Sequence, residues 1–473
     1  MLCFEDIRIS IKSQGFEIKE FGFSPHEDQT VAIMESMRNT SEFVCPACKS
    51  PVYIYDTFQI NIKDMPLWKD IPLTLCCLGH RYRCTKCKET FTENVPFVYP
   101  GTRITCRAAN WIKSFLDNKL SIRAIQNITG IHWETIRKIQ IETMEASLSE
   151  REQQLNDENY KPKYLAVDEF AIHKGHSYAT CVMDLETGDI LWVGKGRSIN
   201  DFAQFFEDVP SDTLSAVIAV AMDMNASYNR LVEQYLPHAQ IVYDRYHMQA
   251  QFGREVLGAV RLEEARRHKQ TANEILADSQ KETDKDKKAE LKERSVAEKK
   301  LYTKLKKSRW QLLRNSKNLS DESSEYLDEI LQDHKNLAVC YAMKEEMCRL
   351  FELKDYEEAL DGWTKWFEAA KQSGIYALRH FAELKEKRIP GLAAHAAFPV
   401  STGKLEGFNN KIKVAKRIGY GYRDENYFFT LIRYLSLPSV RNLSPNFREE
   451  PIKSFEAVCL FTDIFFLQCT LRL

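Results

Sequence analysis

The stretch Tyr164-Leu-Ala-Val-Asp168-Glu169-Phe170 is a short apolar run that ends in acidic residues. The same pattern returns in Ala216-Val-Ile-Ala-Val-Ala-Met-Asp223. Short runs rich in β-branched and small apolar residues predict central strands that are covered on both faces. Ligands of such sheets bind outside the strand ends, so a carboxylate there belongs to a site more often than to a core. Either aspartate alone could equally be an edge residue or a helix cap.

A third acidic segment lies far downstream and reads Ser401-Thr-Gly-Lys-Leu-Glu406-Gly-Phe-Asn409-Asn410-Lys-Ile-Lys413. At helical spacing, one face of this segment carries Glu406, Asn409, Asn410 and Lys413. A carboxylate, two amides and a cation make a poor core face and suit a site for a metal ion and a phosphate. An ordinary amphipathic surface helix is the alternative, since Leu405, Phe408 and Ile412 supply its apolar stripe.

The start of this helix carries further signals. We expect Ser401 or Thr402 to cap it, and Gly403 and Gly407 to let another backbone come close. Together with the two strand-end aspartates, Glu406 gives three oxygen donors from distant segments. Such a set is what a pair of Mg²⁺ ions needs for phosphodiester chemistry.

Longer stretches around these acids carry a family resemblance. They are Val-Asp168-Glu-Phe-Ala with Lys174-Gly175, Tyr178-Ala-Thr-Cys-Val-Met-Asp184-Leu-Glu-Thr-Gly188, Asp223-Met with Tyr228, Ile241-Val-Tyr-Asp244-Arg-Tyr-His247, and Glu406 to Lys413 followed by Lys416-Arg417 and Gly419-Tyr-Gly-Tyr-Arg423. In this order they resemble the ISL-three family of bacterial insertion-sequence transposases, which have an RNase H-like core of the DDE type. The resemblance runs from roughly residue 40 to residue 450.

The resemblance implies that Asp168, Asp223 and Glu406 form the acidic triad and hold two Mg²⁺ or Mn²⁺ ions. It also implies a transposase that binds the terminal inverted repeats of its element, cleaves DNA there and transfers the strands to target DNA. We expect it to act as a homodimer or higher oligomer on DNA, in the bacterial cytoplasm at the nucleoid. A sequence-specific DNA-binding regulator with a non-catalytic scaffold is the alternative from another class, and a nuclease without strand transfer is a further one.

A basic run follows Glu406 directly. It consists of Lys411, Lys413, Lys416 and Arg417. Such a run suits the phosphates beside a nuclease site, although a solvated helix face would have the same composition.

Four cysteines in the N-terminal part form two close pairs, Cys45-Pro-Ala-Cys48 and Cys84-Thr-Lys-Cys87. Each pair places two thiolates on one tight turn, and two such turns complete a tetrahedral site for a structural Zn²⁺. The strand-like stretches between them fit a zinc ribbon. Cys76, Cys77 and His80 are competing ligands, but we expect the two cysteines to be buried thiols on a strand.

A helix-turn-helix is predicted between Leu120 and Ile139. Ser121 caps the first helix, Gly130 makes the turn, and Ile136 and Ile139 of the second helix point inward. Thr135, Arg137 and Lys138 are then left outward, where they could contact DNA in a major groove. A plain helical hairpin is the alternative.

The order of elements after Asp168 predicts the fold class. Three strands in hairpin order, then two more that alternate with helices, predict an α/β, RNase H-like mixed sheet. Asp244 and His247 follow the fifth strand, where a pair that braces the strand-helix junction is at least as plausible as a catalytic pair. Neither is assigned as a metal ligand. With Asn409 and Asn410 they are treated as supporting residues.

The segment from about residue 250 to residue 395 predicts helices only, which makes it a large insertion in the core. Residues 270–307 are dense in charge and predict a long solvated hairpin. Trp310, Trp363 and Trp366 are expected to pack this insertion. The predicted division of the chain is 1–40 N-terminal segment, 41–100 zinc ribbon, 101–150 helix-turn-helix, 160–250 first part of the core, 251–395 helical insertion, 396–450 last core helix with the basic region, and 451–473 tail.

Composition sets wider limits. The chain has 473 residues, a formal net charge of −1 and 13 cysteines. A balanced charge means that any DNA-binding surface is a local patch. No signal segment or long apolar run is evident, and no membrane partner is expected. The apolar tail is interrupted by Glu456 and Asp463 and predicts a docking segment or a poorly ordered end.

Overall fold

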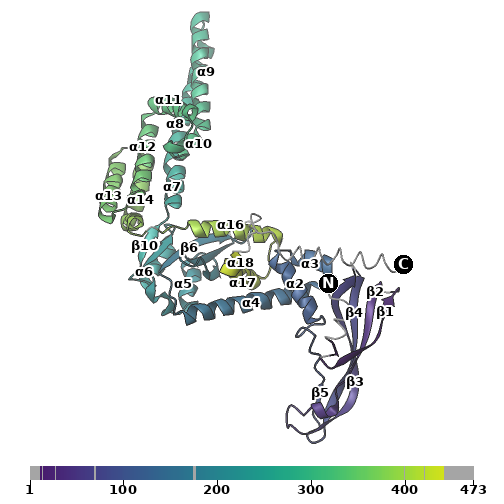
Figure 1. Ribbon diagram of the computed structural model, residues 1–473. Coiled ribbons are helices and arrows are strands. Elements are labelled where there is room, and N and C mark those ends of the chain that lie inside the picture. Colours follow the sequence, from purple (N-terminus) through teal and green to yellow (C-terminus); the bar gives the residue numbers. More distant parts are fainter. Residues whose placement is uncertain are drawn as a thin grey trace, which may run out of the picture.

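The computed structural model describes residues 11–441 except 13, 27, 69–70, 174–176, 399 and 420. The tail 451–473, and Lys174 and Gly175 of the family motif, lie outside the described residues. Figure 1 shows an elongated molecule in which a β-rich module at one end is joined through a long helix to a central sheet. A helical arm extends from the far side of that sheet.

The N-terminal module is a five-stranded sheet in the order β1-β2-β4-β3, with β5 paired to β4. Its strands are β1 (Phe16–Ser24), β2 (Gln29–Ser36), β3 (Val52–Trp68), β4 (Ile71–Cys84) and β5 (Thr90–Thr92). Phe16, Met34 and Ile62 are fully buried in its core. The predicted division separates an N-terminal segment, residues 1–40, from the zinc ribbon, residues 41–100. In the structure, β1 and β2 lie in that first segment, but β2 pairs with β4, so they belong to the same sheet.

Three helices follow, α2 (Cys106–Asp117), α3 (Ile122–Thr129) and α4 (Trp133–Asp157). The predicted caps are confirmed: the Ser121 side chain accepts from the amide of Ala124 at 3.2 Å, and Gly130 ends α3 with φ +66°. Ile136 and Ile139 are fully buried, as predicted. The helix α4 then continues to residue 157, and its residue Met144 packs against the central sheet. It therefore links the two modules (Figure 1).

The central sheet has the order β10-β9-β6-β7-β8. Its strands are β6 (Tyr164–Ala171), β7 (Tyr178–Asp184), β8 (Ile190–Lys195), β9 (Ala219–Met222) and β10 (Gln240–Tyr243). The strand β7 is antiparallel to β6 and β8, whereas β9 is parallel to β6 and β10. This mixed pattern follows from two hairpin connections and then two helical crossovers.

Helices cover both faces of this sheet, which explains why its strands are almost continuously apolar. One face packs against α5 (Ile199–Asp208) and α6 (Ala226–Tyr235) through residues such as Phe202 and Leu231. The other face packs against α16 (Gly403–Ile418) and α17 (Glu425–Ser436), which is followed by α18 (Pro438–Arg441). The apolar stripe of α16, with Leu405 and Phe408, is thus a core face as its spacing predicted.

All of residues 245–396 are described, and they form helices and their connections. The helices are α7 (Arg245–Phe252), a π-helical turn (Gly253–Leu257), α8 (Gly258–Lys281), α9 (Lys285–Lys307), α10 (Arg309–Leu313), α11 (Asp321–Asp333), α12 (Lys335–Leu350), α13 (Tyr356–Gln372), α14 (Tyr376–Lys385) and α15 (Ile389–Ala393). The predicted charged hairpin is confirmed, because α8 and α9 form the projecting arm (Figure 1). These long helices are charged, and within the described residues none is long and apolar enough to cross a membrane.

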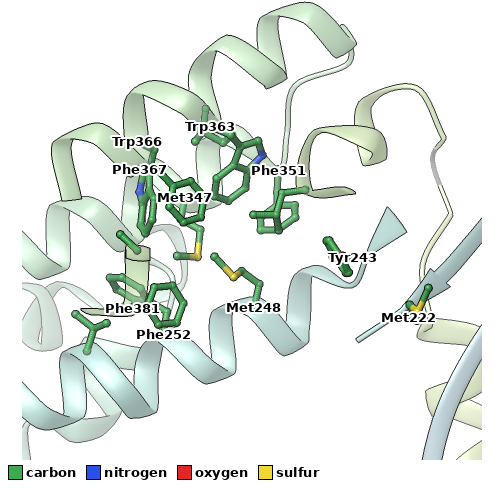
Figure 2. Packing of buried hydrophobic residues seen from close by; sticks show 14 of the residues in the cluster. Met222, Tyr243, Met248, Phe252, Met347, Phe351, Trp363, Trp366, Phe367 and Phe381 are labelled. Carbon is green, nitrogen blue, oxygen red and sulfur yellow. The ribbon is translucent and has the colours of Figure 1, made fainter. Parts of the chain in front are cut away.

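The base of the insertion packs onto the end of the central sheet. Figure 2 shows Trp363 and Trp366 among Phe252, Phe381 and other aromatic residues. Both tryptophans are buried, as predicted. For Trp310 the same prediction is wrong: α10 turns Leu312 into the core, and Trp310 is 64% exposed.

Candidate active site

Asp168 and Asp223 lie side by side on neighbouring parallel strands. The register of β6 and β9 pairs Ala166 with Ala221, so both aspartates stand two residues further along. Paired strands run about 4.8 Å apart, which brings the two carboxylates to one edge of the sheet. The amide of Glu169 donates to Asp168 Oδ1 at 2.8 Å, and the amide of Asn225 donates to Asp223 Oδ1 at 2.8 Å.

This proximity changes the acidity of Asp168. The pKa of Asp168 is raised to about 6, chiefly by burial and to a smaller extent by the charge of Asp223, while the amide of Glu169 and His247 act in the opposite direction. Burial likewise raises the pKa of Glu169, although Arg197 counteracts this from 3.3 Å. Two neighbouring carboxylates with little compensation favour a cation between them.

The helix α16 reaches Asp168 through Asn409. The Asn409 Nδ2 group donates to Asp168 Oδ2 at 2.8 Å. The Oδ1 atom of the same amide is buried and, among the described residues, receives no hydrogen bond. Glu406 lies on the same helix face about 4.5 Å earlier along the axis, and its side chain is exposed. Asn410 and Lys413 are also exposed and hydrogen-bond to each other at 3.1 Å.

A cleft of about 320 Å³ opens beside Asp223. Its lining residues are Asp223, Met224, Asn225, His247, Ala250, Gln251, Arg254 and Lys385. Arg254 and Lys385 were not predicted, because each is one of many cations on a helix and only the packing of the π-helical turn against α14 brings them here. Their charges suit an anionic substrate near the carboxylates.

Asp244 connects two distant helices. Its Oδ1 accepts from the amides of Tyr246 and His247 at 2.8 and 3.2 Å, which caps α7. Its Oδ2 accepts from the hydroxyl and the amide of Thr402 at 2.6 and 3.2 Å. Asp244 is buried, so these bonds fix the start of α16 against the end of β10.

Two predictions for the first turns of α16 differ from the structure. Thr402 stands at the capping position, but its hydroxyl donates to Asp244 and does not cap its own helix. Ser401 Oγ accepts from the amide of Gly403 at 3.3 Å. The prediction that Gly407 admits another backbone is wrong, since nothing lies within 4 Å of a Cβ built there.

The oxygen donors at this edge fit a hard divalent cation. Asp168 and Asp223 supply carboxylates, and the orphaned Asn409 Oδ1 is a further buried oxygen that lacks a donor. In the described part of the chain, the one group of three or more possible metal ligands within 4.8 Å of one another is a cysteine cluster. Asp168, Asp223 and Glu406 do not form such a group, so the structure does not bring all three carboxylates within 4.8 Å of one another.

The cysteine cluster comprises Cys45, Cys48, Cys84 and Cys87. The Sγ atoms of Cys45 and Cys87 are 3.5 Å apart, and those of Cys48 and Cys84 are 3.4 Å apart. Four sulfurs at about 2.3 Å from a central zinc form a tetrahedron with edges of about 3.8 Å, so the cluster fits that ion closely. Of the competing ligands, Cys77 is buried as expected, whereas Cys76 is only partly buried and accepts from Gln59 at 3.1 Å.

On α4, the second helix of the predicted helix-turn-helix, some outward side chains already contact other parts of the protein. Arg137 forms an ion pair with Asp424 and lies over the ring of Tyr427 at 4.9 Å. Lys138 Nζ donates to the carbonyls of Pro100 and Gly101 at 2.8 and 3.2 Å. Thr135 is half-buried.

The basic run of α16 divides in the same way. Lys411, Lys413 and Arg417 are exposed on the helix. Lys416 Nζ instead donates to the carbonyl of Ala171 at 2.6 Å. Three of the four cations are therefore accessible to a phosphate backbone.

Comparisons with known proteins give this arrangement a context. The ISL3 family profile, described as transposase, matches residues 165–432, which is 268 of the 473 residues. The transposase for insertion sequence element IS1001 of Bordetella parapertussis is 32% identical over 424 residues, covering 89% of this chain and 95% of that protein. The transposase for insertion sequence element IS1557 of Mycobacterium tuberculosis is 25% identical over 289 residues, covering 61% of this chain and 63% of that protein. With a profile match over more than half of its length and a relative aligned over nearly all of it, the chain belongs to the ISL3 family of transposases.

Proposed function

We propose that this chain is a DDE transposase that cleaves the ends of its insertion sequence and joins them to target DNA. The observation that carries the proposal is the hydrogen bond from Asn409 to Asp168, at 2.8 Å. It ties the helix of Glu406 to the strand end where Asp168 stands beside Asp223. Asp168 and Asp223 share one edge of the sheet, the cations of the cleft lie next to Asp223, and Glu406 lies on the helix that Asn409 anchors there.

We further propose that the central domain is RNase H-like. Its strand order and its mixture of antiparallel and parallel pairs support this assignment. The helical segment 245–396 would then be an insertion before the last core helix. Asp168, Asp223 and Glu406 would hold two Mg²⁺ or Mn²⁺ ions, which when bound supply Lewis-acid activation of a water or a 3′ hydroxyl for in-line attack on a phosphate.

The residues of the chain itself would prepare this chemistry. Asn409 donates to Asp168 Oδ2 and the amide of Glu169 donates to Oδ1, so the two bonds would keep the carboxylate oriented. Arg254 and Lys385 would attract and position the DNA backbone in the cleft. The exposed lysines of α16 would contact the phosphates that flank the reacting one.

DNA recognition is proposed to lie in the N-terminal half. The four cysteines would hold one structural Zn²⁺, and the helix-turn-helix would bind the terminal inverted repeats. A complex that holds two element ends implies at least two copies of the chain, so a homodimer or a higher oligomer on DNA is proposed.

The test is a nicking and joining assay with the full chain. Labelled duplexes that carry each end of the element are incubated with Mg²⁺, with Mn²⁺ or with EDTA. We expect a metal-dependent nick at the element end, followed by joining of the freed 3′ end to a second duplex. Specific binding of the ends without any nick would contradict the proposal and favour a DNA-binding regulator with a non-catalytic core. A nick without joining would favour a nuclease.

A further inference from the structure

A second hollow adjoins the candidate catalytic cleft. It measures about 650 Å³ and lies between the α7–α8 segment and α10. Ala250 and Arg254 line both hollows, so the two spaces meet along one side of the same helix. Tyr246, Ala250 and Arg254 recur every four residues on that side, whereas Met248 and Phe252 point into the core of the insertion (Figure 2).

The lining combines apolar walls with positive charge. Leu257 and Leu312 form buried parts of the wall, and Arg254, Arg261 and Arg309 contribute cations. Among the described residues that line the hollow, none is acidic. Glu255 contacts Arg254 at 3.4 Å from outside the hollow, but Arg254 itself remains largely exposed.

The arginines also lack compensation inside the hollow. Arg261 uses one guanidinium nitrogen for the carbonyls of Leu305 and Lys306, at 3.0 and 2.9 Å. Burial lowers the pKa of Arg261, and the neighbouring charge of Arg309 lowers it further. An anionic ligand would relieve this repulsion.

An aromatic ring stands at the opening. Tyr246 lines the hollow, yet this residue is 61% exposed. Such exposure is unusual for an aromatic residue, because tyrosines are more often at least partly covered. Flat rings, apolar walls and arginines together are the chemistry that proteins use to hold unstacked bases and their phosphates. A DNA duplex is far too wide for this hollow. The volume of the hollow lies in the usual range for a small-molecule site.

We propose that this hollow receives a single nucleotide displaced from the DNA duplex next to the phosphate that is cut. The inference rests on the proposed function, since DNA must first lie in the adjoining cleft. The base would stack on Tyr246 and lie against the apolar wall, and its phosphate would lie near Arg254 and Arg309. Displacing one base would let the backbone bend towards Asp168 and Asp223.

Two substitutions test the site without touching the carboxylates. Tyr246→Ala removes the ring, and Tyr246→Phe keeps it. Ala259→Phe fills the hollow from an exposed lining position, with Val296→Phe at an exposed position on the distant arm as the matched control. The three positions are on the surface of the insertion, and equal melting temperatures would show that the four variants fold.

The experiment scans 5-iododeoxyuridine through the element-end duplex and irradiates the complex with the full chain. We expect one position beside the cut phosphate to cross-link to residue 246 in the wild type, in Tyr246→Phe and in Val296→Phe. Ala259→Phe should lose the cross-link and should nick more slowly than Val296→Phe, because the base can no longer enter the hollow. Tyr246→Ala should nick roughly 10-fold more slowly, as expected for the loss of one base–aromatic stack. An abasic nucleotide at the cross-linking position should restore nicking by Ala259→Phe, because no base then needs the space.

The outcomes separate this inference from the proposed function. Wild-type nicking without a cross-link to residue 246 at any position would overturn the nucleotide site and leave the transposase assignment intact. Wild-type nicking and cross-linking that Ala259→Phe leaves unchanged would also overturn it. A wild-type chain that does not nick would contradict the proposed function itself.

Discussion

The two candidate metal sites of this chain are built in opposite ways. The four cysteines come from two turns beside one pair of strands, and their sulfurs lie 3.4–3.5 Å apart. The carboxylates come from β6, from the end of β9 and from α16, and the helical segment 245–396 stands between the last two. One site is closed by local structure, whereas the other depends on the packing of the whole central domain.

The difference indicates what each metal contributes. Four thiolates at such short distances repel one another unless an ion binds them, so we expect the cysteine module to depend on a bound Zn²⁺ to fold. Asp168 is instead held by the hydrogen bond from Asn409, and the start of α16 is held by the bond from Thr402 to Asp244. The central domain should therefore fold without its catalytic ions and should lose only chemistry when those are removed.

The largest expected effect concerns the carboxylates. Asp168→Asn, Asp223→Asn and Glu406→Gln keep the side-chain shapes but remove the charges that bind the ions. Each should slow nicking by about 1,000-fold or more, since the reaction depends on both ions. End binding should stay unchanged, because it depends on the N-terminal modules. Asp212→Asn, on the surface of the same domain, is the control and should nick normally. Wild-type nicking by Glu406→Gln would exclude that residue from the site.

The second effect concerns the ribbon. Purified protein should carry about one Zn²⁺ per chain, and Cys84→Ser should release it. A structural zinc contributes on the order of 10 kcal/mol to folding, so residues 40–100 should lose protection from amide hydrogen exchange while the central sheet keeps it. Cys76→Ser is the matched control, because this thiol lies in the same sheet but outside the cluster. Reduced, freshly purified protein without zinc would refute the ribbon assignment.

The third effect concerns a hydrogen bond that positions α16, the helix that carries Glu406. It should therefore affect both the structure around the candidate site and its chemistry. Thr402→Val removes the hydroxyl that donates to Asp244, and Asp244→Asn removes the charge that receives it. A buried hydrogen bond to a charged group contributes about 1.5–3 kcal/mol, so nicking should slow by about 10- to 100-fold. The Mg²⁺ concentration for half-maximal rate should also rise, which a merely destabilised protein would not show. Thr402→Ser should behave like the wild type, and equal metal dependence in all variants would contradict the positioning role.

Local patterns in the sequence predicted much of both sites. The paired cysteines, the caps at Ser121 and Gly130, and the two strand-end aspartates follow from spacing within a few residues. The helical face with Asn409 was also visible from its period. These features depend on neighbours in the chain, which the sequence shows directly.

The remaining features depend on tertiary packing. No local pattern indicates that β1 and β2 extend the sheet of the cysteine module, because that pairing joins distant segments. Trp310 looked like a core residue from its type, but a five-residue helix has only one side to bury and Leu312 takes it. Arg254 and Lys385 are ordinary helix cations until the π-helical turn and α14 come together at the cleft. The hydrogen bond from Thr402 to Asp244 could not be predicted either, since 158 residues separate the two.

The smallest expected effect concerns Arg137, where α4 meets α17 of the central domain. Arg137 pairs with Asp424 in a partly exposed position, and such pairs contribute up to about 1 kcal/mol. If Arg137 exchanges Asp424 for a DNA phosphate, Arg137→Ala should reduce the slope of log binding constant against log salt by about 1. Asp424→Asn should then strengthen end binding slightly, because the arginine loses its internal competitor. If Arg137 serves only to hold α4 on α17, both substitutions should lower the melting temperature and leave the salt slope unchanged. Titrations of element-end and random duplexes at several salt concentrations distinguish these results, and an unchanged slope would move DNA contact from Arg137 to other residues of the module.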